Sequence, residues 1–130
     1  MSGLFDLSGR TAVVTGGGRG IGLMATRGLL EAGARVYIAS RDLAACEAAA
    51  TSLAHLGTVV PFGHDLSTVE GCRALAADVV AREDAVHVLV NNSGAAWGAA
   101  VDDYPESGWD KAMDLNAKAP FFLVQSFLPL

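Results

Sequence analysis

The sequence predicts an α/β protein in which helices cover both faces of a parallel sheet. Short apolar segments that end in turn residues alternate with longer segments whose apolar residues recur at helical spacing. Four such pairs follow one another, and no linker, low-complexity stretch or repeat interrupts them. This order is typical of one parallel sheet, because parallel neighbours need a crossover connection, usually a helix.

Four apolar segments are predicted as buried strands. They cover residues 10–15, 35–39, 58–62 and 86–90. The last segment, Val86 to Val90, is almost entirely apolar, which is typical of a central strand covered on both faces. Right-handed crossovers then predict the strand order 3-2-1-4, the N-terminal part of a Rossmann-type doubly wound sheet.

The segments between the strands are predicted as helices with one apolar face. The first covers Gly20 to Ala32, and its predicted buried face is Ile21, Met24, Ala25 and Leu29. The second begins after the capping residue Asp42, and its predicted face is Leu43, Cys46, Ala50 and Leu53. The third opens on a capping box from Ser67 to Glu70, with the predicted face Val69, Cys72, Leu75, Ala76, Val79 and Val80. A final helix is predicted from about Glu106.

Composition and charge exclude several classes of protein. The net charge is -5, and no basic stripe is present to neutralise phosphates, so nucleic-acid binding is not expected. Cys46 and Cys72 lack the spacing of a zinc site and are interpreted as small core residues, and no metal is expected. Residues 1–9 have no leader pattern and no apolar run reaches membrane-spanning length, which favours a cytoplasmic protein.

A cluster of glycines follows the first predicted strand. The turn reads Thr15-Gly16-Gly17-Gly18-Arg19-Gly20-Ile21-Gly22. Glycines suit this position because the chain must turn sharply and let a pyrophosphate approach bare backbone at a helix N-terminus. Gly-rich turns alone are common, but a position between a buried strand and an amphipathic helix favours a nucleotide site.

The spacing T-G-x-x-x-G-I-G resembles the short-chain dehydrogenase/reductase family, in which Gly16, Gly20 and Gly22 would line the pyrophosphate. Asp65-Leu66 resembles the family's acidic pair at the adenine ring, and Asn91 to Gly94 resembles its N-N-A-G motif with Ser93 in place of Ala. The resemblance covers the chain from about Leu7. It implies this set of cofactor-binding residues: Thr15, Gly16, Gly18, Arg19, Gly20, Ile21, Gly22, Ser40, Arg41, Asp65, Leu66, Asn92, Ser93 and Gly94.

Some of these residues also have a purely structural interpretation. Asp65 alone could be a carboxylate at a helix start, and Asn91 and Asn92 could be turn formers at a strand end. Within the family, the segment from Ala96 to Ala100, followed by Tyr104-Pro105 and Gly108-Trp109, resembles 3-oxoacyl reductases of the rhamnolipid pathway. This resemblance implies a carbonyl substrate, either a small molecule or an acyl thioester.

The end of the second strand favours NADP(H) over NAD(H). An NAD enzyme usually has a carboxylate there that binds both ribose hydroxyls and would repel a 2′-phosphate. Here Ser40 takes that position, and Arg41 follows with a guanidinium suited to a phosphate. Arg19 adds a second cation in the glycine turn, so we expect two cations and no carboxylate around the phosphate. Either arginine alone could be a solvated surface charge.

The family's catalytic Tyr and Lys are not found in these 130 residues. No Tyr is followed four residues later by Lys, since Arg41 follows Tyr37 and Gly108 follows Tyr104 at that spacing. We therefore interpret residues 1–130 as the N-terminal NADP(H)-binding part of a single Rossmann domain without its catalytic Tyr/Lys part. Such a chain is expected to be inactive by itself.

Asn116 lies where the family has the Asn of its catalytic tetrad. Pro120 has no N–H to donate to the Asn116 carbonyl, which the resemblance assigns to a water in the proton relay. A tolerated helix kink explains the same proline equally well. The last helix, around Phe121 to Leu128, is apolar on nearly all faces, and the resemblance implies a homodimer or homotetramer.

Three functions remain open from the sequence. The first is an NADPH-dependent reductase of a 3-oxo substrate. The second is a module that binds or senses NADP(H) without catalysis, which the missing Tyr and Lys would permit. The third is a fragment that binds nothing. The presence of Asn116 favours descent from an active enzyme.

Overall fold

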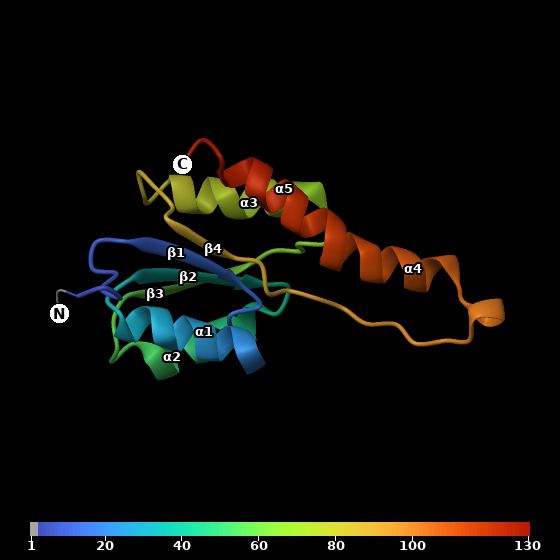
Figure 1. The fold of residues 1–130 in the computed structure, drawn as a ribbon, viewed down its shortest axis with the longest axis horizontal. Coiled ribbons are helices and arrows are strands. Elements are labelled where there is room, and N and C mark those ends of the chain that lie inside the picture. Colours follow the sequence, from blue (N-terminus) through green and yellow to red (C-terminus); the bar gives the residue numbers. More distant parts are fainter. Residues whose placement is uncertain (1–2) are drawn as a thin grey trace.

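The computed structural model describes residues 3–130 and contains one parallel sheet of four strands (Figure 1). The strands are β1 (Thr11–Thr15), β2 (Arg35–Ser40), β3 (Val59–Gly63) and β4 (Val88–Val90). Their order is β3-β2-β1-β4, and each neighbouring pair is parallel. The predicted α/β class, Rossmann-type topology and strand order 3-2-1-4 are confirmed.

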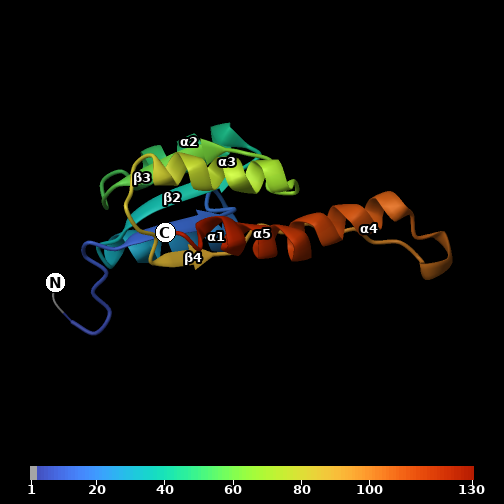
Figure 2. The same cartoon turned by 90° about the horizontal axis from the view of Figure 1, so that it is seen from above.

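Helices cover both faces of the sheet (Figure 1). On one face lie α1 (Gly20–Glu31) and α2 (Leu43–Leu53); on the other, α3 (Val69–Val80) packs beside α5 (Ala119–Phe127). The chain between β4 and α5 extends away from the sheet (Figure 2). It contains a 3-10 turn (Val101–Asp103), α4 (Glu106–Met113) and a π turn (Asp114–Lys118) that continues directly into α5.

Two hydrophobic cores form because successive strand side chains point to opposite faces of the sheet. Val13 and Tyr37 lie in the core under α3 and α5. Val14 and Ile38, one residue later in each strand, lie in the core over α1 and α2. Both cores need apolar strand residues, which explains why β1 and β2 read as unbroken apolar runs.

The predicted buried face of α1 is wrong at two of its four residues: Leu29 packs against the core as expected and Ala25 is half-buried, but Ile21 and Met24 face outward. Ile21 is 73% exposed and Met24 65% exposed, whereas Gly22, Thr26 and Leu30 are buried. The reason is close packing at the helix start, because a Cβ at position 22 would overlap the Gly16 carbonyl oxygen. Only a glycine can face the turn there, and this contact rotates the larger apolar side chains outward.

The other helix faces are predicted with smaller errors. In α2, Cys46 and Leu53 are buried as expected, but Ala49 takes the core position predicted for Ala50, and Leu43 is exposed. The cap is confirmed, since the Asp42 carboxylate accepts from the backbone N–H of Ala45 at 3.0 Å.

In α3, Cys72, Leu75, Ala76 and Val79 are buried as expected, but Val80 is exposed. The predicted capping box also shifts by one residue. Thr68, rather than Ser67, accepts the N–H of Gly71 at 3.0 Å. The Ser67 hydroxyl is engaged elsewhere, since it donates to Asp65 at 2.6 Å.

β4 pairs only with β1 within residues 3–130, so it forms an edge of the sheet. The central position that its apolar sequence predicts is therefore not realised in this part of the chain. The strand is also shorter than predicted and begins after His87, whose ring Nδ1 accepts from the Thr11 N–H at 3.0 Å. No helix formed by the described residues is long and apolar enough to cross a membrane.

Candidate functional site

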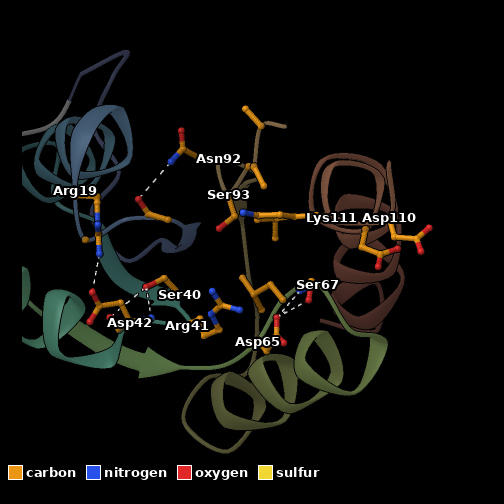
Figure 3. A pocket seen from close by; sticks show the side chains of 18 of the residues that line it. Arg19, Ser40, Arg41, Asp42, Asp65, Ser67, Asn92, Ser93, Asp110 and Lys111 are labelled. Atoms are coloured by element: carbon orange, nitrogen blue, oxygen red, sulfur yellow. Dashed lines mark hydrogen bonds and ion pairs between the residues drawn. The ribbon is translucent and has the colours of Figure 1, made fainter. Parts of the chain in front are cut away.

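A cavity of 1010 Å³ opens at the carboxyl ends of the strands (Figure 3). This edge is where open α/β sheets bind ligands, since chains leaving adjacent strands toward opposite faces open a crevice there. In this fold that divergence lies between β1, whose chain continues into α1, and β4, whose chain runs toward α5. Ten of the predicted site residues line the cavity: Gly16, Gly18, Arg19, Ser40, Arg41, Asp65, Leu66, Asn92, Ser93 and Gly94.

The glycine turn brings backbone to the cavity wall. Gly16 has a φ of +66°, which favours glycine, and its N–H donates to the Ala39 carbonyl at 2.8 Å. Gly17 packs over β2, where a Cβ would lie 2.6 Å from the Ile38 Cγ2. The sequence interpretation did not include Gly17 in the site, and its role is to seat the turn on the sheet.

Four predicted residues of this turn do not line the cavity: Thr15, which is described below, and Gly20, Ile21 and Gly22. Gly22 is buried against the turn, and a Cβ there would also lie 2.5 Å from the Asn92 Nδ2. Its glycine is therefore required by helix packing, whatever binds nearby. Gly20 has open space around it and a φ of +57°, and the Ile21 side chain points to solvent.

The N-terminus of α1 has the properties of an anion site. Its cap residue Arg19 makes no side-chain bond to the first-turn N–H groups. Those N–H groups have no partner inside the helix and carry the positive end of its dipole. Gly18 and Arg19, which directly precede this helix, line the cavity, and a helix start beside a cavity favours an anion such as a pyrophosphate.

Thr15 is fully buried and ties β4 to β1. Its hydroxyl accepts from the N–H groups of Asn92 and Ser93 at 3.0 and 3.1 Å, and donates to the Val90 carbonyl at 3.3 Å. The Asn92 amide in turn donates to the Gly16 carbonyl at 3.3 Å. Thr15 thus shapes the site from beneath, and Asn92 joins the β4 end to the glycine turn.

Charges of both signs surround the end of β2. Arg41 makes no side-chain hydrogen bond or ion pair within residues 3–130. The Arg19 guanidinium, however, contacts the Asp42 carboxylate at 2.7 Å. The expectation of two cations and no carboxylate is therefore wrong, because Asp42, the cap residue of α2, lines the cavity and one of its oxygens remains available after capping.

Asp65 forms a local turn after β3. Its carboxylate accepts the Ser67 N–H at 3.1 Å and the Ser67 hydroxyl at 2.6 Å. The Ser67 hydroxyl holds the pKa of this carboxyl below its usual range, and Arg41 adds a smaller effect in the same direction. Leu66, buried beside it, and Ser67 complete this wall of the cavity.

The opposite wall comes from α4 and the π turn, which sequence interpretation missed. Ser107, Asp110, Lys111 and Asp114 line it. Their spacing of three, four and seven residues puts them on one helical face, a signal present in the sequence. A polar helix face does not by itself predict a site, because such faces usually point to solvent. Only the fold shows that the polar face of α4 lies at the cavity (Figure 3).

The side chain of Asn116 makes two hydrogen bonds to the backbone of Ala95 and so acts as a structural clamp between the loop after β4 and the π turn. Its Oδ1 accepts the Ala95 N–H at 3.0 Å, and its Nδ2 donates to the Ala95 carbonyl at 2.5 Å. Asn116 lies in the π turn, where Ala119 N–H bonds to the Asp114 carbonyl, just before Pro120. The side chain thus joins the β4 loop to the helix without lining the cavity, and the proposed role of its carbonyl stays a prediction.

Neither tyrosine lines the cavity. Tyr37 is buried, and its hydroxyl donates to Glu83 at 2.7 Å; burial and then this carboxylate raise its pKa. Tyr104 donates to the Trp97 carbonyl at 3.2 Å, on the loop after β4. Within residues 3–130 no cluster of His, Cys, Asp and Glu could hold a metal, and both cysteines are free and buried.

The comparisons with known proteins agree with this geometry. The short chain dehydrogenase family matches residues 10–130. A rhamnolipid-biosynthesis 3-oxoacyl-[acyl-carrier-protein] reductase of Pseudomonas aeruginosa is 49% identical over 97% of the chain and 49% of the relative. A probable galactose dehydrogenase of Rhizobium meliloti is 35% identical over 95% of the chain and 49% of the relative.

Solved structures give the same result. The Pseudomonas aeruginosa RhlG/NADP active-site complex superposes with a TM-score of 0.95 at 48% identity, over 100% of this chain and 51% of that one. A metagenomic short-chain oxidoreductase in complex with NADP has a TM-score of 0.90 at 37% identity, over 95% of this chain and 57% of that one. The chain thus spans about half the length of the curated relatives it matches. It belongs to the short-chain dehydrogenase family.

Proposed function

We propose that this chain is the cofactor-binding part of an NADP(H)-dependent oxidoreductase that transfers hydride between the nicotinamide and a ketone or secondary alcohol. One observation carries the choice of cofactor. At the end of β2 the cavity is lined by Ser40 and by Arg41, which has no ion-pair partner among residues 3–130, where an NAD enzyme would place a carboxylate. The similarity to two proteins solved with NADP supports the same choice.

The residues of the cavity fit the parts of this cofactor. The N–H groups at the start of α1 would hold the pyrophosphate, and Arg41 would hold the 2′-phosphate. Asp65 and Leu66 would lie at the adenine ring, and residues 92–94 after β4 would contact the rest of the bound cofactor. When bound, the nicotinamide supplies or accepts the hydride.

The proposed substrate is a 3-oxoacyl thioester. The support is the similarity to the Pseudomonas aeruginosa 3-oxoacyl-[acyl-carrier-protein] reductase over nearly the whole chain. We further propose that residues 1–130 form one part of a single Rossmann domain, and that turnover needs a Tyr and a Lys in Y-x-x-x-K spacing, which these residues do not contain. The 130 residues alone should then show no carbonyl reduction.

A non-catalytic NADP(H)-binding module is the alternative function. The double hydrogen bond between Asn116 and Ala95 supports it, because a structural clamp explains this residue without any proton relay. Asn116 therefore no longer separates the two functions. Carbonyl reduction by any natural form of this protein would exclude the alternative.

Location and assembly are proposed from the same resemblance. We expect a cytoplasmic protein that forms a homodimer or homotetramer. The exposed apolar residues Phe121 and Val124 on α5 and Leu128 directly after it support a further packing partner, since three large apolar side chains so close together seldom face water. Sedimentation analysis would measure the oligomeric state.

The test of the cofactor proposal is Arg41→Ala. Losing one charge-assisted contact to phosphate costs about 1.5–3 kcal/mol, so NADPH affinity should fall about tenfold to a hundredfold while NADH affinity stays the same. Arg73→Ala removes the same charge from an exposed position on α3 and serves as the control. Equal losses for both cofactors in a calorimetric titration would contradict the assignment of Arg41.

A further inference from the structure

The ion pair between Arg19 and Asp42 occupies the part of the cavity proposed for the 2′-phosphate. The Arg19 Nη2 lies 2.7 Å from the Asp42 Oδ2, and both residues line the cavity with Ser40 and Arg41 (Figure 3). In this arrangement Arg19 is already neutralised. Of the two arginines at this end, only Arg41 has no ion-pair partner among residues 3–130.

The two partners differ in how firmly the fold holds them. Asp42 caps α2 through Oδ1 to the Ala45 N–H at 3.0 Å, and its own N–H donates to the Ser40 hydroxyl at 3.1 Å. Ser40 also donates to the Asp42 carbonyl at 3.2 Å. The Arg19 side chain is long and 72% exposed, with no other hydrogen bond among the described residues.

We propose that Asp42 is an internal counter-ion that competes with the 2′-phosphate of the cofactor for Arg19 and so limits the preference for NADP(H). The proposal rests on the proposed function, because it assumes that phosphate at this end of the cavity. When the phosphate binds, Arg19 moves toward it and Asp42 stays at the helix start.

The size of this effect follows from the exposure of the pair. An exposed ion pair contributes at most about 1 kcal/mol, so its loss on phosphate binding changes affinity by about fivefold. A phosphate gains more than this from charge-assisted bonds to two guanidinium groups. Binding therefore still occurs, but with a lower affinity than the two arginines alone would provide.

Asp42→Asn isolates the charge of Asp42. Asn is as good a helix cap as Asp, so the bond to the Ala45 N–H is retained and α2 should remain folded. The probe is adenosine 2′,5′-bisphosphate, and 5′-AMP, which lacks the 2′-phosphate, is the matched ligand. In calorimetric titrations we expect Asp42→Asn to bind the bisphosphate about fivefold more tightly and 5′-AMP unchanged.

Two further variants identify the cause. Glu31→Gln breaks the exposed pair with Arg27 on α1 and changes the net charge by the same amount, and it should leave both affinities unchanged. In an Arg19→Ala background, Asp42→Asn should have little effect, because the competition needs Arg19. A fivefold gain that persists in that background would overturn competition in favour of direct repulsion.

The outcomes separate this proposal from the proposed function. If the unmodified chain binds the bisphosphate no better than 5′-AMP, the NADP(H) assignment and the proposal both fail. If the chain prefers the bisphosphate but Asp42→Asn leaves its affinity unchanged or lower, only the counter-ion proposal fails. Circular dichroism must give the same spectrum for every variant compared.

Discussion

The sheet with its packed helices differs sharply from the arm that follows β4. Residues 11–90 supply the buried residues of one core and, together with α5, those of the other, and the central strands β1 and β2 are almost wholly buried. The arm, residues 95–118, has one buried residue, Gly108, and its large side chains such as Val101 and Trp109 are exposed. Both regions supply a wall of the same cavity.

The arm is held by a small number of specific contacts. Asn116 bonds both backbone groups of Ala95, and the Trp97 ring packs so closely on Gly108 that a Cβ there would lie 2.5 Å from its Cδ1. Lys111 lies 5.6 Å from the centroid of the same ring. The cavity wall formed by the sheet is therefore held by buried cores, whereas the wall formed by the arm is held by a few individual contacts. The two walls should respond differently to mutation.

The largest effect is expected for Gly22→Ala in the packed region. The new methyl group would overlap the Gly16 carbonyl oxygen, and neither the turn nor α1 can move without disturbing the sheet. We expect a loss of at least about 3 kcal/mol in the free energy of unfolding, measured by urea denaturation.

Gly20→Ala is the matched control for that variant. Position 20 has open space but a φ of +57°, so its cost should be only about 1–2 kcal/mol. Equal losses at the two positions would show that backbone conformation, not packing, requires glycine at the start of α1.

A smaller and more local effect is expected for Asn116→Ala in the arm. Loss of both bonds to Ala95 should lower the local opening free energy by about 1–3 kcal/mol, because each hydrogen bond contributes about 0.5–1.5 kcal/mol. Amide exchange should accelerate at Ala95 and in α4 but not in β1. Asn91→Ala, at an exposed amide with no side-chain bond among residues 3–130, is the control, and acceleration spread evenly over both regions would contradict a local clamp.

The smallest effect is expected for the pH dependence of Asp65→Asn. The Ser67 hydroxyl lowers the pKa of the folded carboxyl below its ordinary value of 3.8, so the charged form stabilises the fold. This contribution is complete above that value and is lost as the pH falls through the lowered pKa. The difference in Tm between the original chain and the variant should therefore shrink from about pH 5 to about pH 2. A Tm difference that stays constant over this pH range would contradict the stabilising role of the Asp65 charge. Asp102→Asn, at an exposed position in the arm, controls for general effects of removing a negative charge.

The topology and most of the residues that line the cavity could be predicted from the sequence. Burial on both faces requires unbroken apolar strands, and this signal is local, so β1 and β2 were placed nearly to the residue. The buried face of α1 could not be predicted in the same way. Its orientation depends on a contact between Gly22 and Gly16, and a glycine carries no hydrophobic signal.

The tertiary structure also assigned new roles to predicted residues. Thr15 lies beneath the site and holds the end of β4, and Arg19 is paired with Asp42 across a gap of 23 positions in the chain. The polar face of α4, including Asp110 and Lys111, reaches the cavity only because the arm returns toward the sheet.

The fold class, the strand order and the edge of the sheet where the cavity opens could all be predicted from the residues alone. These follow from periodicity, glycine spacing and the fixed hand of the crossovers, which act over a few residues or apply to every chain. Only the tertiary structure decided which charges meet, as Asp42 and Arg19 do, and which side of a helix is buried. Such contacts depend on distances between segments remote in the chain, and those distances are set by packing.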